Sequence, residues 1–300
     1  MTANSFAFLE NRSVIHVNGS DAAEFLQGLI TNDITLVDIK STIWAALLTP
    51  QGKFLHEFMV AMRDKAYILD CELDRRPDLI KRLSQFKLRA KVIISKSDIL
   101  SVAAAWGPDI SLNLQLDMKP GFSVNRNDVL VFFDPRLAEA GVRLIGKREN
   151  IETIMAESGF TITTQNDFDT HRIGLGLPDG SRDMEIGKAL ILENGFEELG
   201  GVDFKKGCYI GQELTARTYY RALIKKRLIP VRIEGDAPPN GTSLSIEGVN
   251  AGEMRSSAEG YGLALIRLVP WQESSNGVLT TSESRLFPTL PSWLTLPTNK

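Results

Sequence analysis

Cys208 is the residue whose type and position most clearly suggest chemistry. It lies in the segment KKGCYIGQELTART, residues 205–218, after Lys205 and Lys206 and before a run of good helix formers that starts at Gly211. Backbone N–H groups at a helix start and nearby ammonium groups both favour a thiolate over a thiol. From the residues alone, a reactive or ligating thiol and an incidental loop cysteine both remain open.

The same region is strongly basic. Residues 205–227 contain seven lysines and arginines but one acid, Glu213, in a chain whose net charge is −3. Such a region would suit an anionic ligand through phosphate- or carboxylate-type contacts, or it could be only a solvated helix face. The chain's net charge and the lack of an obvious aromatic stacking platform argue against nucleic acid as the ligand.

Other common sites are missing from the sequence. His16, His56 and His171 are scattered singly, so no cluster has the spacing of metal ligands. The second cysteine, Cys71, follows the apolar run AYILD and is interpreted as the end of a strand with no chemical role.

The bulk composition indicates a compartment and a class of protein. Two cysteines in 300 residues favour a reducing environment. The start MTANSFAFLENRS does not resemble a signal or transit peptide, and no apolar run reaches the roughly 18 residues that cross a bilayer. We therefore predict a bacterial cytoplasmic protein that does not bind membranes.

The hydrophobic patterns predict an α+β protein with a β-rich end. Residues 20–33, SDAAEFLQGLITND, predict a helix capped by Ser20 or Asp21, with Glu24 three residues after Asp21. Residues 42–72 predict three strands with turns at 50–53 and 63–65. After about residue 225, short apolar runs alternate with Gly, Pro, Asn and Asp, which is typical of a small β-barrel. The predicted domains are therefore 1–225, with two α+β subdomains, and 226–300, a barrel.

The segment around Cys208 also carries a long signature. Residues 206–209 (KGCY), 211–213 (GQE) and 216–217 (AR) match the pattern K-G-C-[YF]-x-G-Q-E-x-x-[AS]-R. In these residues the chain resembles the YgfZ family, folate-binding relatives of the glycine-cleavage T-protein that help to mature iron–sulfur proteins. It is most similar to the mitochondrial branch and its bacterial counterparts. Residues 21–33, 47–60, 171–180 and 251–268 also resemble family segments, so the likeness covers most of the chain.

The resemblance implies a fold and a set of roles. The fold would be that of the T-protein, with mixed α/β subdomains around a central opening and a C-terminal barrel. Cys208 would be a ligand or redox thiol that shares a transient [4Fe–4S] cluster with a carrier protein or a target apoprotein, because one cysteine cannot hold a cluster alone. The residues implied to bind tetrahydrofolate or a derivative are Lys206, Gly207, Tyr209, Gly211, Gln212, Glu213, Arg217 and Arg172.

Some of these signature residues could instead have purely structural roles. Gly207 and Gly211 would serve turn geometry, and Gln212 and Glu213 could cap the helix.

Three departures from the T-protein pattern bear on catalysis. The acidic pair that includes the T-protein's catalytic aspartate aligns with His56 and Glu57, its folate-holding glutamate aligns with Gly174, and an aspartate is replaced by Cys208. These changes favour an iron–sulfur accessory factor over an aminomethyltransferase. Two alternatives remain open: a tetrahydrofolate-dependent aminomethyl- or methyltransferase with Glu57 as its carboxylate, and an interaction module with a vestigial folate pocket.

Overall fold

The computed structural model describes residues 4–296, and these form two compact units. The first unit contains the chain through Leu48 together with Leu55–Phe168 and Gly200–Ile210. The second contains Thr49–Phe54, Asp169–Leu199 and the chain from Gly211 onward. The signature around Cys208 therefore crosses from one unit to the other between Ile210 and Gly211.

A five-stranded sheet in the first unit has the order β3-β4-β5-β2-β6 and carries α1 and α2. Alternate side chains of its strands and the apolar faces of both helices form one core, which includes Ile15, Leu26, Phe58 and Leu79. The bounds are β2 Arg12–Asn18, α1 Ala22–Gln27, the 3₁₀ helix η1 Ile34–Leu36, β3 Ile43–Leu48, β4 Phe54–Arg63, β5 Ala66–Glu72, α2 Arg76–Lys87 and β6 Ile93–Ser97.

A six-stranded sheet in the same unit has the order β11-β1-β7-β10-β9-β8. Its core contains Phe8, Val131, Leu144 and Ile151. The bounds are β1 Ser5–Phe8, β7 Ser101–Trp106, α3 Ile110–Leu114, β8 Ser123–Arg126, β9 Val129–Phe133, the 3₁₀ helix η2 Ala138–Ala140, β10 Val142–Gly146, α4 Arg148–Glu157 and β11 Thr161–Ile162.

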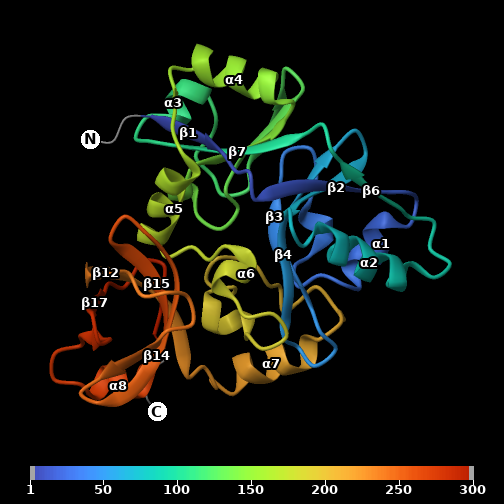
Figure 1. The fold of residues 1–300 in the computed structure, drawn as a ribbon. Coiled ribbons are helices and arrows are strands. Elements are labelled where there is room, and N and C mark those ends of the chain that lie inside the picture. Colours follow the sequence, from blue (N-terminus) through green and yellow to red (C-terminus); the bar gives the residue numbers. More distant parts are fainter. Residues whose placement is uncertain (1–3, 297–300) are drawn as a thin grey trace. The chain divides into compact units, whose positions relative to one another are not determined.

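The second unit contains a closed barrel of six strands in the order β12-β15-β14-β13-β16-β17, coloured orange to red in Figure 1. Closure leaves the barrel without a free sheet edge, and residues such as Val231, Met254 and Ile266 fill its interior. The bounds in and around it are α5 Gln165–Gly174 (whose first residues belong to the first unit), α6 Gly180–Asp183, the 3₁₀ helix η3 Ile191–Asn194, α7 Gln212–Tyr220, β12 Lys226–Gly235, β13 Ser243–Ile246, β14 Val249–Ala258, β15 Tyr261–Arg267, α8 Leu268–Glu273, β16 Leu279–Thr280 and β17 Ser284–Pro288.

The structure confirms the predicted α+β class and the C-terminal barrel. The three strands expected between residues 42 and 72 are β3, β4 and β5. The barrel's first strand begins at Lys226, and the compact unit that contains it also takes in two earlier segments of the chain. Among residues 4–296, no helix combines the length and apolar character that crossing a bilayer requires.

The helix predicted over residues 20–33 is much shorter in the structure. Helix α1 ends at Gln27, and Asp21 at its N-cap makes no side-chain capping bond. The Asp21 carboxylate instead accepts hydrogen bonds from the Ser20 hydroxyl and from the backbone N–H of Lys91. The segment after Gln27 leaves the helix, so its carbonyl groups are free to bind a different partner.

Candidate functional site

The first half of the signature is held in place by the side chain of Lys206. Its Nζ donates to the backbone oxygens of Gln27 at 2.5 Å and Ile30 at 2.8 Å, at and directly beyond the end of α1. In return, the Gln27 side-chain amide donates to the Lys206 carbonyl at 3.0 Å, and the Ile210 N–H donates to the Gly28 carbonyl at 3.2 Å. Both ends of the loop, residues 206 and 210, are therefore hydrogen-bonded to the segment at the end of α1.

The Lys206 side chain is buried together with Tyr209. Its ammonium lies 5.0 Å from the centre of the Tyr209 ring, and both residues are less than a tenth exposed. Burial lowers the pKa of Lys206 to about 8. The Lys206 ammonium is thus bound to carbonyl oxygens inside the first unit, and its contact with an anionic ligand stays a prediction.

Cys208 lies on this fastened loop, and its side chain is exposed. The preceding Gly207 has φ +93°, a conformation that L-residues with a Cβ rarely adopt. Cys71 is the opposite case: it is buried in β5, and burial raises its pKa to about 12, so it stays a thiol. Of the two cysteines, Cys208 is the one that a ligand or partner can reach.

The second half of the signature begins the helix α7. Gly211 is its N-cap with φ +84°, so Cys208 precedes the first helical residue by four positions. Glu213 and Arg217, one turn apart on the exposed face, form an ion pair of 2.5 Å. Thr215 and Thr218 are the buried residues of α7. Tyr219 near the end of α7, and Leu223 just beyond it, are both more than a third exposed.

The turn at residues 50–53 lies against the start of α7 within the second unit. Gly52 has φ +77°, and a Cβ placed there would lie 2.7 Å from both the Gly211 oxygen and the Leu214 Cβ. This close approach explains a glycine at this position better than turn geometry alone.

Substituting Gly52 by alanine tests that contact. We expect Gly52→Ala to lower the free energy of unfolding by about 1–3 kcal/mol more than Gly187→Ala does, because of overpacking. Gly187 is a matched control, since it has φ +74° and a Cβ added there would meet open space. Chemical denaturation of the two variants measures the difference, and equal losses would show that only backbone strain matters.

Arg172 was implied to bind folate, but the structure gives it an internal role. Its Nε and terminal nitrogens donate to Asp169 at 2.6 Å, Asp183 at 2.9 Å and Ser256 Oγ at 2.9 Å. The side chain is 2% exposed. Within the second unit, Arg172 therefore joins α5 and α6 to the barrel strand β14, and its role as a folate ligand stays a prediction.

Glu57 is enclosed in a cluster of charged residues between the two sheets of the first unit. Its carboxylate accepts from Arg12 at 2.5 Å and from the Trp44 indole at 2.6 Å, and it is 2% exposed. Arg12 also donates to Asp70 at 2.7 Å, and Arg143 of the other sheet lies 3.5 Å from the second oxygen of Asp70. Each Glu57 oxygen accepts from a protein donor, and the buried carboxylate is not exposed to a substrate.

His56, the neighbour of Glu57, faces a different cluster. Its Nε2 lies 2.9 Å from an Asp78 oxygen, and the side chain is buried. Burial, followed by the charge of Arg75, lowers the pKa of His56 to about 4.

This shift predicts a pH dependence of stability. The unfolded chain binds a proton at His56 near pH 6.5, whereas the folded protein does so only near pH 4. Stability is therefore lost as the pH falls from about 6.5 to 4, by about 3 kcal/mol at most. We expect urea denaturation to show a smaller loss over this range in His56→Gln than in the wild type. Parallel curves would contradict a depressed pKa at His56.

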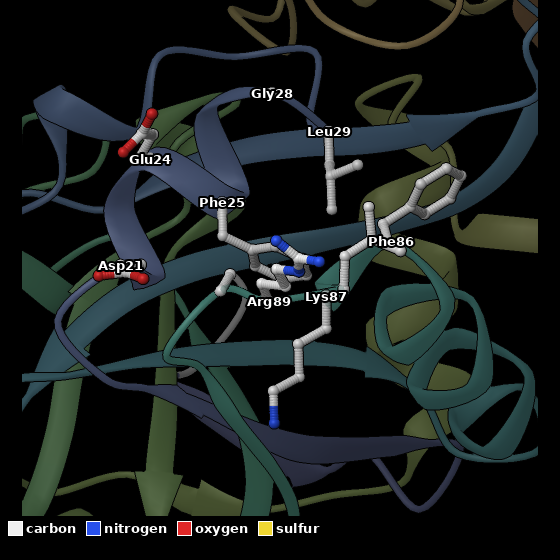
Figure 2. A pocket seen from close by; sticks show the side chains of 10 residues that line it. Asp21, Glu24, Phe25, Gly28, Leu29, Phe86, Lys87 and Arg89 are labelled. Atoms are coloured by element: carbon white, nitrogen blue, oxygen red, sulfur yellow. The ribbon is translucent and has the colours of Figure 1, made fainter.

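A pocket of about 410 Å³ lies next to the segment that holds the signature loop. Gly28, whose carbonyl binds Ile210, is part of its lining. Figure 2 shows Phe25 and Leu29 extending from the α1 side toward the end of α2, while the carboxylates of Asp21 and Glu24 point away. The residues implied to bind folate all fall within the described part of the chain, and none of them lines this pocket.

Sequence patterns did not identify the residues that hold the loop. Gln27, Gly28 and Ile30 act mainly through backbone oxygens, which no motif records. The available signal was Gly28 itself, a helix-ending residue inside a segment that otherwise favours a helix.

Comparison of the whole chain with solved structures defines the class of fold. The aminomethyltransferase T of the glycine cleavage system from Bartonella henselae superposes with a TM-score of 0.76 at 14% identity, covering 98% of this chain and 87% of that one. A family profile described as the CAF17 C-terminal β-barrel domain matches residues 225–296. The protein thus has the T-protein fold.

Sequence relatives define the family within that class. The mitochondrial iron–sulfur cluster assembly factor IBA57 of Mus musculus is 32% identical, and that of Homo sapiens 31% identical; each match covers 95% of this chain and 84% of the relative. A homologue from Neurospora crassa is 30% identical over 77% of this chain and 54% of its own length. The chain belongs to the IBA57 family of iron–sulfur cluster assembly factors.

Proposed function

We propose that this protein is a folate-binding accessory factor that acts with a partner protein in the assembly or repair of [4Fe–4S] clusters. The observation that carries the proposal is the exposed Cys208 on a loop fastened by Lys206, in a member of the IBA57 family. A reactive group on a fixed loop loses little freedom when it meets its target.

The chemistry proposed for Cys208 is that of a thiolate ligand to a cluster in transit. Iron–sulfur clusters are held mostly by cysteine thiolates, and a [4Fe–4S] cluster takes four. Cys71 is buried and cannot share a cluster with a surface loop. The partner, a cluster carrier or target apoprotein, would supply the remaining ligands, and the cluster would be cargo rather than a resident cofactor.

The folate part of the proposal rests on the exposed residues of the signature. Lys206 and Arg172 are engaged with protein groups, and Tyr209 is buried, so these three do not fit as direct ligands. Arg217 is 51% exposed and could exchange its Glu213 partner for a carboxylate of folate. The signature resemblance, with Arg217 exposed, is what supports tetrahydrofolate as the ligand.

The alternative activity, aminomethyl or methyl transfer, is not favoured by any contact of Glu57. A general base must come within hydrogen-bond distance of the proton that it removes, and Glu57 is closed off by Arg12 and Trp44.

Location in the bacterial cytoplasm also belongs to the proposal. Free cysteines suit a reducing compartment, while the named relatives are mitochondrial.

Two measurements test the two parts of the proposal separately. In cells that lack the gene, the activity of a [4Fe–4S] enzyme should fall and should return when the wild-type gene is supplied, while an enzyme without a cluster is unaffected. Normal [4Fe–4S] activity in the deletion would refute the assembly role. Calorimetry of the purified protein with tetrahydrofolate tests the second part, because a vestigial pocket would give no saturable heat.

A further inference from the structure

A pocket with three basic residues in its lining and a mostly apolar surface lies on the second unit, where β12 begins and β15 ends. It has a volume of about 500 Å³ and is lined by Lys225, Lys226, Arg267, Val269 and Pro270. Lys225 and Lys226 come from the basic signature region, whereas Arg267 is about forty residues further along the chain. The backbone bond from Leu268 N to the Lys225 oxygen, 3.0 Å, holds the two segments together.

The pocket collects cations that the rest of the basic region does not use. Arg217 is paired with Glu213, and Arg227 is buried with Glu198 at 2.5 Å. In contrast, the described residues provide no salt bridge for Lys225, Lys226 or Arg267. Some of the basic residues between 205 and 227 are thus neutralised by ion pairs. Those without an ion pair among the described residues include Lys225 and Lys226, which line this pocket.

The register of the barrel places two of these cations opposite one another. Lys226 of β12 pairs with Arg267 of β15 in the antiparallel ladder. Like charges at directly opposed positions destabilise a sheet. An anionic group placed between them would remove that repulsion. Glu193 and Glu185 interact with the charge of Lys226 from nearby, but neither lines the pocket, and burial raises the pKa of Glu193.

The wall beside the cations is aliphatic. Val269 is 56% exposed although it is apolar, and Pro270 adjoins it in α8. Over residues 4–296 no aromatic ring belongs to the lining, so the pocket offers no platform for stacking bases. Cations beside an aliphatic surface match a protein segment in which acidic residues flank an apolar side chain.

We propose that this pocket is a docking site for an acidic segment of a partner protein, with carboxylates on Lys225, Lys226 and Arg267 and an apolar side chain against Val269. The site requires neither Cys208 nor folate. A negative result for this docking site would therefore not affect the proposed function. A negative result for the proposed function would likewise not affect the docking site.

The test uses the full-length protein and a fluorescein-labelled peptide of glutamates and leucines, with binding followed by anisotropy. We expect saturable binding that weakens as salt is raised, and no binding of the matching glutamine–leucine peptide. Arg267→Glu should weaken binding by about tenfold or more, because it replaces an attraction by a like-charge contact. Val269→Asp should weaken it as well.

Lys81→Glu is the matched control, since it makes the same charge reversal at an exposed position of α2. It should leave peptide affinity within about twofold of the wild type, and larger losses would reduce the effect to overall charge. Equal affinity of wild type and Arg267→Glu would overturn the proposal. Tighter binding of polyuridylate than of the peptide, lost in Arg267→Glu, would overturn it in favour of a phosphate site.

Discussion

Arg12→Ala is expected to lower the free energy of unfolding by about 3–5 kcal/mol, since it removes one partner from a buried ion pair. Arg12 bridges Glu57 and Asp70, and both carboxylates are almost fully buried. Without the guanidinium, two negative charges would remain between the sheets with reduced compensation. Urea denaturation followed by circular dichroism measures the loss.

Arg217→Ala provides the comparison for this result. Its ion pair with Glu213 is of similar length but solvent-exposed, so its loss should cost less than about 1 kcal/mol. Similar losses for the two variants would show that burial does not make the Arg12 ion pairs matter more to stability than an exposed pair. Because Arg217 also remains a folate candidate, the same variant can be used in calorimetry with tetrahydrofolate.

Cys208→Ser should abolish rescue of the [4Fe–4S] enzyme in deletion cells while leaving stability unchanged. Serine nearly keeps the size of the side chain but replaces the sulfur by a hydroxyl oxygen, which is a poor ligand for iron. The side chain is exposed, so the exchange removes no packing. Enzyme activity in the complemented strain, together with the melting temperature of the purified variant, gives both quantities.

Cys71→Ser should show the opposite pattern. A hydroxyl placed in the buried core of the first unit should cost about 1–3 kcal/mol, but the function should persist where the protein is folded. Full rescue by Cys208→Ser would reduce Cys208 to a structural residue. Loss of rescue by both variants, with only Cys71→Ser destabilised, would indicate that the assay follows protein level as well as chemistry.

Local patterns were sufficient for most of the secondary structure. The strands β3, β4 and β5 follow from apolar runs divided by Gly52 and by the turn at residues 63–65, and the barrel follows from many short runs between turn residues. These features depend on neighbours in the sequence. The sequence predicts too long a helix α1, because its end at Gln27 is stabilised by Lys206, which lies 179 positions away.

The candidate site was predicted in part. The type and spacing of residues directed attention to Cys208 and its loop, and the exposure of Cys208 agrees with an accessible thiol. The roles of the cations could not be assigned in this way. Lys206, Arg172 and Lys225 are all basic residues, and the sequence does not distinguish their roles. In the structure the first two are buried and donate to protein oxygens, whereas the third lines a pocket.

The sequence by itself determined the family, the α+β class, the barrel and the position of the signature cysteine, because each depends on residue identity and short-range order. Only the tertiary structure decided which charges remain available. A charged side chain is neutralised by whatever group the fold brings within a few ångströms, and these partners lie far away in sequence. Thus Glu57 became part of an internal ion pair, Lys206 a fastening for the loop, and Arg267 a lining residue of a pocket.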